Sequence, residues 1–174
     1  MKIKILVAAH KKFPMPEVEG YLPVLVGAKK NYKPDIPYQR DDEGENISEK
    51  NPNYNELTAI YWAWKNLKDV DAVGLVHYRR LFFEKKPYNL NNVISIENVE
   101  KLLTKYDVIL PKKRNYYIET NYSHYVHAHH QEPLDKTREI IQASYPQYLV
   151  KYDEVMKRSK AHMFNMFIMK WEAF

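Results

Sequence analysis

The chain contains no cysteine, and only four of its 174 residues are glycine. Without thiols it can form neither disulfides nor thiolate metal sites, which is consistent with a reducing compartment. Gly20, Gly27, Gly44 and Gly74 lie too far apart for the glycine-rich turn of a dinucleotide-binding fold or a P-loop. Side chains would therefore have to do more of the work in holding a phosphorylated ligand.

Long apolar runs are also absent. No segment approaches the roughly 20 apolar residues of a membrane-spanning helix, and the opening "MKIKILVAAHKKF" lacks the features of a secretion signal. The net charge of +5 favours anionic partners: phosphorylated small molecules, nucleic acid or an acidic membrane face. Because no helix carries a dense stripe of Lys and Arg, we expect no nucleic-acid partner.

Short and long apolar segments alternate along the chain, which is typical of an α/β fold. Buried strands are expected at residues 2–9, 72–77, 106–111 and 162–170, and helices at 53–67, at 95–106 and after Pro133 and Pro146. Residues 13–52 are expected to form a long ordered loop with little regular structure. We therefore predict one domain over residues 1–174, an α/β sandwich with a mostly parallel central sheet flanked by helices.

Two helices carry capping signals. Asn53, with Glu56 three positions later, predicts the start of the first helix, and Ser95 predicts the start of the second. The spacing of apolar residues in the first helix predicts a buried face. This face would consist of Leu57, Ile60, Tyr61, Trp64 and Leu67.

Four segments together carry a family resemblance: "DDEGENISEKNPNYNELTAIYWAWKN", "DAVGLVHYRRLFF", "YDVILPKK" and "HMFNMFIMKWEAF". In this order they resemble a bacterial family of capsular and exopolysaccharide synthesis domains of unknown function, grouped with GT-A-type glycosyltransferases. The resemblance implies a GT-A-like fold with the sugar nucleotide across the carboxyl ends of the strands, where open parallel sheets generally bind ligands. Family members usually run further, so we expect a domain truncated at its C-terminus.

The implied activity is that of a hexosyltransferase-type glycosyltransferase. It would transfer a sugar from a nucleotide sugar, expected to be a UDP-sugar, to a carbohydrate or lipid-linked acceptor. Such an enzyme would act in the cytoplasm at the inner face of the membrane, where a basic surface favours peripheral association with anionic lipids. The alternative is a non-catalytic nucleotide- or glycan-binding module.

Four polar residues end the strand expected at 72–77: His77, Tyr78, Arg79 and Arg80. Negative charge develops on a departing nucleoside diphosphate, and most GT-A enzymes stabilise it with Mn²⁺ or Mg²⁺ held by an Asp-x-Asp motif. Arginine can grip phosphate oxygens without a metal. We predict that these four residues bind the donor and that no cofactor is required, although a divalent metal (Mn or Mg) is compatible with the site. The alternative is a structural arginine paired with a carboxylate.

Two other segments invite a donor-site interpretation. Asp69-Val70-Asp71 matches the Asp-x-Asp pattern but precedes its strand, so an ordinary turn is the stronger interpretation. Asn46, Ser48 and Asn51 offer neutral donors and acceptors for a base, a ribose or a sugar, and by the family resemblance we predict that they contact the donor. Ordinary loop composition explains them equally well.

A histidine-rich segment precedes the third expected helix. If the segment is extended, His127 and His129 share a face, and we predict that they bind the acceptor or the sugar, with a metal site as the weaker alternative. Glu132 and Asp135 are the predicted catalytic carboxylates, one of which would take the proton of the acceptor hydroxyl. Acidic residues also favour helix starts for electrostatic reasons, which is the competing interpretation.

The last expected strand contains one amide. Asn165 interrupts an apolar run, and a buried amide must be hydrogen-bonded. We predict that Asn165 and the preceding His162 bind the sugar or the acceptor. A structural link between two loops would explain Asn165 equally well.

Overall fold

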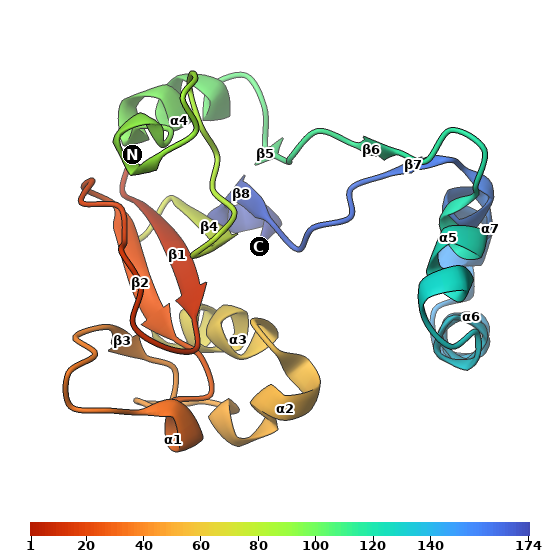
Figure 1. The fold of residues 1–174 in the computed structure, drawn as a ribbon, viewed down its shortest axis with the longest axis horizontal. Helices are drawn as coiled ribbons and strands as arrows, with labels where there is room; N and C mark the ends of the chain where they lie inside the picture. The colour runs from red at the N-terminus through yellow and green to blue at the C-terminus, as the bar shows by residue number, and fades with distance from the viewer. The chain divides into compact units, whose positions relative to one another are not determined.

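The computed structural model describes residues 1–174, which form two compact units (Figure 1). One unit comprises residues 1–111 and 165–174, and the other comprises residues 112–164. A division of this kind does not define a functional boundary, so a single transferase-like domain stays a prediction. No helix of the protein is both long and apolar enough to cross a membrane.

The first unit is built on a six-stranded mixed sheet in the order β3-β2-β1-β4-β8-β5. Its strands are β1 (Ile3–Ala9), β2 (Tyr21–Leu25), β3 (Gln39–Arg40), β4 (Ala72–His77), β5 (Val108–Ile109) and β8 (Phe167–Lys170). Strands β3, β2, β1 and β4 run parallel, whereas β8 is antiparallel to both its neighbours. The carboxyl ends of β1, β2 and β4 therefore share one edge with the segment that leads into β8.

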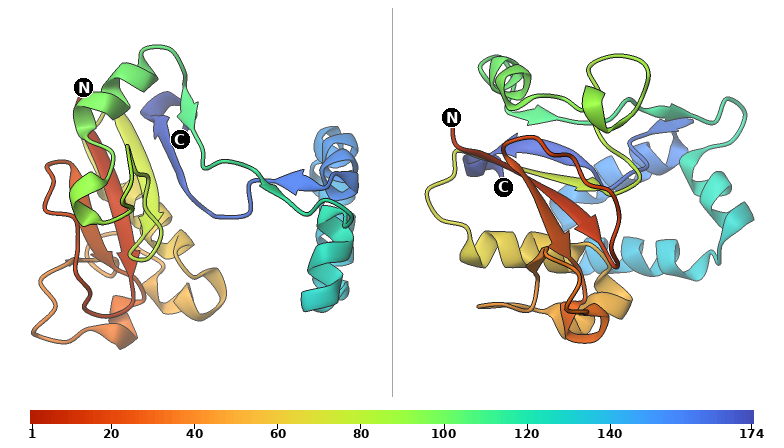
Figure 2. Two further views of the ribbon diagram at one scale, coloured as in Figure 1. Left: turned by 45° about the horizontal axis from the view of Figure 1, so that its top comes forward. Right: turned by 60° about the vertical axis from the view of Figure 1, so that its left-hand side comes forward.

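Two helices cover opposite faces of this sheet (Figure 2). Helix α3 (Leu57–Asn66) packs Ala59, Trp62 and Ala63 against side chains of β1, β2 and β4. Helix α4 (Ile96–Leu103) buries Val99 and Leu103 and begins at the predicted cap Ser95. The predicted α/β fold with a central sheet flanked by helices is confirmed.

The predicted start of the first helix was wrong, and its predicted buried face was right only in part, because Ile60 and Leu67 pack against the core. Asn53 lies in a short helix, α2 (Asn51–Tyr54), and Asn55 has a positive φ of 49°, so that α3 begins only at Leu57. The side chains of Leu57 and Trp64 are 42% and 53% exposed. The face that packs on the sheet is centred on Ala59, Trp62 and Ala63, so that Leu57 and Trp64 lie outside it.

Residues 13–52 contain more regular structure than expected. Besides β2 and β3 they hold α1 (Ala28–Asn31) and the 3-10 turn η1 (Ser48–Lys50). The reason is a buried carboxylate, Asp41, which hydrogen-bonds several parts of this segment at once. A predominance of proline and polar residues therefore did not mean an absence of structure here.

The second unit is mainly helical. It contains the short strands β6 (Arg114–Asn115) and β7 (Lys160–Ala161) and the helices α5 (Asn121–Ala128), α6 (Glu132–Ser144) and α7 (Leu149–Lys157).

Two strands of the first unit are shorter than predicted. The strands predicted at 106–111 and 162–170 are the two-residue β5 and the four-residue β8. Val108 is exposed, and Asn165 precedes β8 and is also exposed, so the predictions of a buried strand and a buried amide were wrong.

Candidate functional site

A cavity of about 260 Å³ lies at the carboxyl edge of the sheet. Its walls come from the ends of β1, β2 and β4 and from the start of α3. The lining residues are Ala8, Ala9, His10, Val26, Asn51, Asn55, Glu56, His77 and Tyr78. Its position agrees with the general rule that open α/β sheets bind ligands beyond the carboxyl ends of their strands.

Two of the lining side chains, Glu56 and His77, contact Asn165 beside this cavity. Glu56 Oε1 lies 3.2 Å from Asn165 Nδ2 and 3.6 Å from His77 Nε2. His77 Nε2 also lies 3.3 Å from the backbone oxygen of Asn165. Because a carbonyl oxygen only accepts hydrogen bonds, this contact assigns the ring proton to Nε2. The structure therefore joins two residues predicted from the sequence, His77 and Asn165, through the carboxylate of Glu56.

Asp41 fixes the backbone beneath this cluster. Its carboxylate is fully buried and accepts hydrogen bonds from the amides of Gly27 (2.7 Å) and Ala28 (2.9 Å). It also accepts from the hydroxyls of Ser48 and Thr58, both at 2.6 Å. Because Thr58 lies in the first turn of α3, Asp41 holds the end of the helix that carries Glu56.

Gly27 is required at its position by its conformation. Its φ is +62°, and an added Cβ would lie 2.6 Å from Oδ1 of Asn51, a cavity-lining residue. Left-handed backbone of this kind favours glycine. The scarce glycines of this chain thus include one that shapes the wall of the cavity.

A tight turn follows β4 at the cavity. The backbone amides of His77 and Arg80 each donate to the other residue's carbonyl, at 3.0 and 2.9 Å. The turn presents Tyr78, whose ring stacks on Phe13 with centroids 3.7 Å apart. The Arg79 guanidinium lies 5.0 Å from the centroid of the Tyr78 ring. The turn therefore places a cation next to a cavity-lining aromatic ring.

Neither Arg79 nor Arg80 lines the cavity itself, and both are exposed. No carboxylate lies within ion-pair distance of Arg79, unlike Arg40, whose guanidinium is paired with Asp42. The structural alternative for Arg79, pairing with an acidic side chain, therefore does not apply. Its role toward a phosphate stays a prediction.

The predicted loop residues divide by location. Asn51 lines the cavity, and its amide donates to the carbonyl of Asn55. Ser48 is buried and its hydroxyl is bonded to Asp41, while the Asn46 amide donates to the carbonyls of Asp42 and Gly44. Of the three, only Asn51 is among the residues that line the cavity.

The other predicted site residues belong to the second unit. The segment expected to be extended forms helix α5, so His127 shares a face with His124 rather than with His129. The carboxylate of Glu119 lies 2.6 Å from Nδ1 of His124 and 2.5 Å from Nδ1 of His127. These contacts, first with His124 and then with His127, lower the pKa of Glu119. His129 lies 4.8 Å from the ring of Tyr125, measured between centroids.

The predicted catalytic carboxylates also lie in this unit, in the first turn of α6. Asp135 accepts hydrogen bonds from the Tyr122 hydroxyl (2.8 Å) and the Gln131 amide (2.7 Å), while Glu132 is exposed. His162 is exposed as well. The catalytic and binding roles of these residues stay predictions.

The structure also bears on the predicted alternatives for a metal. Asp71 lies just before β4, at the amino edge of the sheet, and its carboxylate accepts the Lys2 amide at 2.6 Å. The turn interpretation of Asp69-Val70-Asp71 therefore holds. No group of three or more His, Asp or Glu side chains is arranged to hold a metal ion.

Sequence reasoning missed the central residue of the site. Glu56 was interpreted only as a capping residue, and its contact with Asn165 joins positions 109 apart in the sequence. His10 and Asn55 were missed as well. The sequence did contain a signal for His10, because this residue directly follows β1 just as His77 ends β4. Residues at the carboxyl ends of neighbouring parallel strands meet at one edge of the sheet.

Comparison with known proteins supports a glycosyltransferase-like family. Residues 4–174 match the family model described as a domain of unknown function, DUF4422. The solved apo structure of the bifunctional glycosyltransferase WbbM superimposes with a TM-score of 0.86 and 29% sequence identity, over 99% of this chain and 34% of that chain. The chain thus spans about a third of that protein, and a search of curated proteins found no match. Because the family model covers nearly the whole sequence, the chain belongs to the DUF4422 family.

Proposed function

We propose that the protein is a glycosyltransferase that transfers a sugar from a nucleotide sugar to a saccharide or lipid-linked saccharide acceptor. The observation that carries the proposal is the cavity with Glu56, His77 and Asn165 at the carboxyl edge of the sheet. The likeness to WbbM, a bifunctional glycosyltransferase, over 99% of this chain supports the same reaction class. The GT-A type of fold and the hexosyltransferase class are part of the proposal.

The donor is proposed to be a UDP-sugar. The cavity of about 260 Å³ is slightly below the roughly 300–1,000 Å³ usual for small-molecule pockets, so it suits one part of the donor rather than the whole. Asn51 and Tyr78 line it, and the cations of Arg79 and Arg80 follow Tyr78 in the chain. These two arginines are proposed to stabilise the departing diphosphate, with a divalent metal compatible but not required.

Glu56 is proposed as the general base. In the transfer, the acceptor oxygen bonds to the anomeric carbon, the bond from that carbon to the diphosphate breaks, and Glu56 takes the hydroxyl proton. Asn165 Nδ2 donates to one of its oxygens, and a carboxylate retains further lone pairs for the acceptor hydroxyl. Glu132 and Asp135 are the competing carboxylates, and mutagenesis separates the three.

The acceptor is proposed to be a growing surface polysaccharide or its lipid-linked precursor. His127, His129, His162 and Asn165 are the proposed contacts with the acceptor or the sugar. The net charge of +5 supports peripheral association with an anionic membrane face. A role in capsule or exopolysaccharide synthesis completes the proposal.

The test combines UDP binding with turnover. Calorimetry with UDP, with and without Mn²⁺, and hydrolysis of a panel of UDP-sugars are measured for the wild type and for Glu56→Gln. We expect Glu56→Gln to bind UDP normally but to lose about 10²–10⁴-fold in turnover, because the isosteric amide cannot take a proton. Glu49→Gln is the control, since Glu49 is well exposed and outside the cavity.

The outcomes separate the alternatives. A wild-type protein that neither binds UDP nor cleaves any UDP-sugar contradicts the proposed function. UDP binding without cleavage or transfer indicates the non-catalytic module. Full turnover in Glu56→Gln, together with a loss in Glu132→Gln or Asp135→Asn, moves the base to the second unit.

A further inference from the structure

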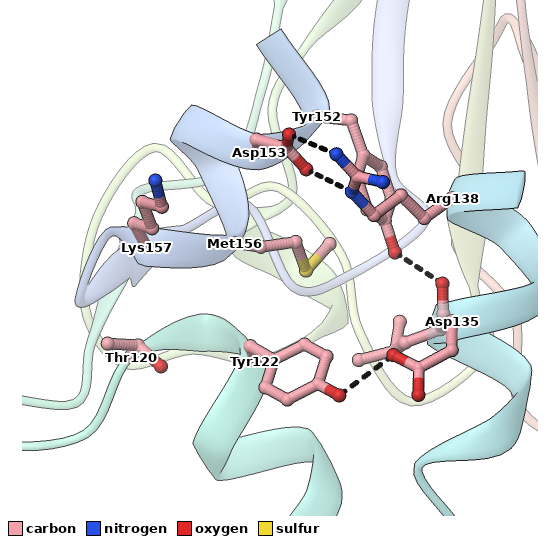
Figure 3. A pocket seen from close by; sticks show the side chains of 9 residues that line it. Thr120, Tyr122, Asp135, Arg138, Tyr152, Asp153, Met156 and Lys157 are labelled. Atoms are coloured by element: carbon pink, nitrogen blue, oxygen red, sulfur yellow. Dashed lines mark hydrogen bonds and ion pairs between the residues drawn. The ribbon is translucent and has the colours of Figure 1, made fainter. Parts of the chain in front are cut away.

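The second unit contains a cavity of its own, of about 320 Å³, between helices α5, α6 and α7 (Figure 3). It is larger than the cavity at the sheet edge, and all its lining residues belong to residues 112–164. The proposed general base, Glu56, lies outside it, and of the competing carboxylates only Asp135 belongs to its lining. It is therefore a separate site that needs its own explanation.

Its walls combine apolar and aromatic surface with fixed polar groups. Tyr122, Leu134, Tyr152 and Met156 provide the apolar part. The hydroxyl of Tyr152 donates to the backbone oxygen of Leu134 at 2.8 Å, which fixes the ring beside the cavity. Sugars present apolar C–H faces that pack on aromatic rings, and their hydroxyls need hydrogen-bonding partners close by.

The charged groups of the lining cancel. The lining contains two carboxylates, Asp135 and Asp153, and two cations, Arg138 and Lys157. Arg138 is bound to both oxygens of Asp153 at 2.8 Å through Nε and Nη2, so its fork is already occupied (Figure 3). With Arg138 paired to Asp153, the remaining cation, Lys157, is balanced by the carboxylate of Asp135, so a phosphorylated ligand would gain no net attraction from the lining. The lining therefore favours a neutral polar ligand.

Asp135 is the group best placed to recognise hydroxyls. The Tyr122 hydroxyl donates to Oδ1 at 2.8 Å and the Gln131 amide donates to Oδ2 at 2.7 Å, so the carboxylate is held in one orientation. A carboxylate can accept about four hydrogen bonds, and these two contacts leave about two for a ligand. Each bond from a sugar hydroxyl to this fixed anion would be charge-assisted.

We propose that this cavity binds a neutral saccharide unit of the glycan acceptor. The assignment rests on the proposed function for the choice of a glycan. It rests on the cavity itself for the neutral, hydroxyl-rich chemistry. It makes residues 112–164 an acceptor-binding unit with a saccharide site of its own, in addition to the donor cavity of the sheet.

The test is direct binding to the full chain. Saturation-transfer NMR and calorimetry are run with galactose, N-acetylglucosamine and lactose as neutral probes and with UDP as the donor probe. We expect at least one saccharide to bind the wild type. Asp135→Asn should weaken that saccharide about ten- to a hundredfold, the effect of losing a hydrogen bond to a charged group, and should leave UDP affinity unchanged.

Matched variants keep the result interpretable. Glu139→Gln lies on the same helix outside the cavity and should bind saccharide as the wild type does. Tyr122→Phe keeps the ring but releases Asp135, so it provides a second measurement if Asp135→Asn does not fold. Absence of saccharide binding to the wild type, or unchanged affinity in folded Asp135→Asn and Tyr122→Phe, overturns the proposal. Failure to bind UDP counts against the donor site instead.

Discussion

Replacing Asp41 with asparagine tests whether one buried carboxylate stabilises the backbone around the cavity at the sheet edge. Each oxygen of Asp41 accepts one backbone amide and one hydroxyl: Gly27 and Thr58 on Oδ2, Ala28 and Ser48 on Oδ1. In Asp41→Asn the new amide nitrogen must face one of the two backbone N–H groups, whichever way it is flipped. The opposing hydroxyl can rotate to accept a hydrogen bond, but the N–H cannot.

The expected cost follows from that geometry. The substitution removes one charge-assisted hydrogen bond, which is worth about 1.5–3 kcal/mol. The cost of leaving the buried N–H unsatisfied, about 1–3 kcal/mol, describes largely the same loss, so the two values are not added. We therefore expect the free energy of unfolding to fall by about 2–4 kcal/mol, a large part of the roughly 5–15 kcal/mol of a typical domain. Urea titration followed by circular dichroism measures the change.

The control is Asp35→Asn. Asp35 forms a solvent-exposed ion pair with Lys12, with its carboxylate 3.6 Å from Nζ. Because exposed ion pairs contribute little, Asp35→Asn should change the free energy of unfolding by less than about 1 kcal/mol. Equal stabilities of Asp41→Asn and the wild type would refute the argument, because they would mean that losing one charge-assisted hydrogen bond at this buried group costs nothing. A large loss in Asp35→Asn would show that the effect is one of net charge.

Three other predictions follow. Gly27→Ala should destabilise the protein by about 1 kcal/mol or more in urea titrations, because φ is +62° and the new Cβ would meet Asn51; an unchanged midpoint would contradict this. Arg79→Ala should weaken UDP binding in calorimetry about tenfold or more, whereas Lys85→Ala should not; equal affinities would remove Arg79 from the proposed donor site. Hydrogen bonds from the amide and hydroxyl of Ser95 lower the pKa of Glu84 from 4.5 to about 2. The ionised Glu84 therefore stabilises the folded state above pH 4.5, and this stabilisation is lost as the pH falls towards 2. Glu84→Gln should make stability less dependent on pH in this range, as measured by acid unfolding.

The alternation of apolar segments was enough to predict the α/β class and the positions of β1, β4 and α4. Those elements have long apolar runs or a local cap, and both signals can be read within a few residues. Strands β3, β5, β6 and β7 have two residues each, which is too short for any periodicity. Their existence depends on neighbours that are distant in the sequence.

The buried face of α3 and the role of Glu56 show the same limit. Trp64 and Leu57 fit an apolar face by spacing, yet the helix buries Ala59, Trp62 and Ala63 against the sheet instead, and the spacing alone does not distinguish the two faces. Glu56 meets Asn165 only after the chain has crossed the whole second unit. His77 was predictable because it ends a long apolar strand, whereas a contact between remote segments leaves no local pattern.

The pairing of β5 with β8 has a consequence for protein engineering. Ile109 and Ile168 are direct partners in this antiparallel pair, so the chain leaves the sheet for residues 112–164 and returns to it at adjacent positions. Partners of this kind have Cα atoms only about 4.5–5.5 Å apart. A short hairpin could therefore replace residues 112–164, together with their β6–β7 pair, without altering any pairing of the six-stranded sheet. The same geometry would allow this segment to be exchanged for a new module while the first unit keeps all its strands.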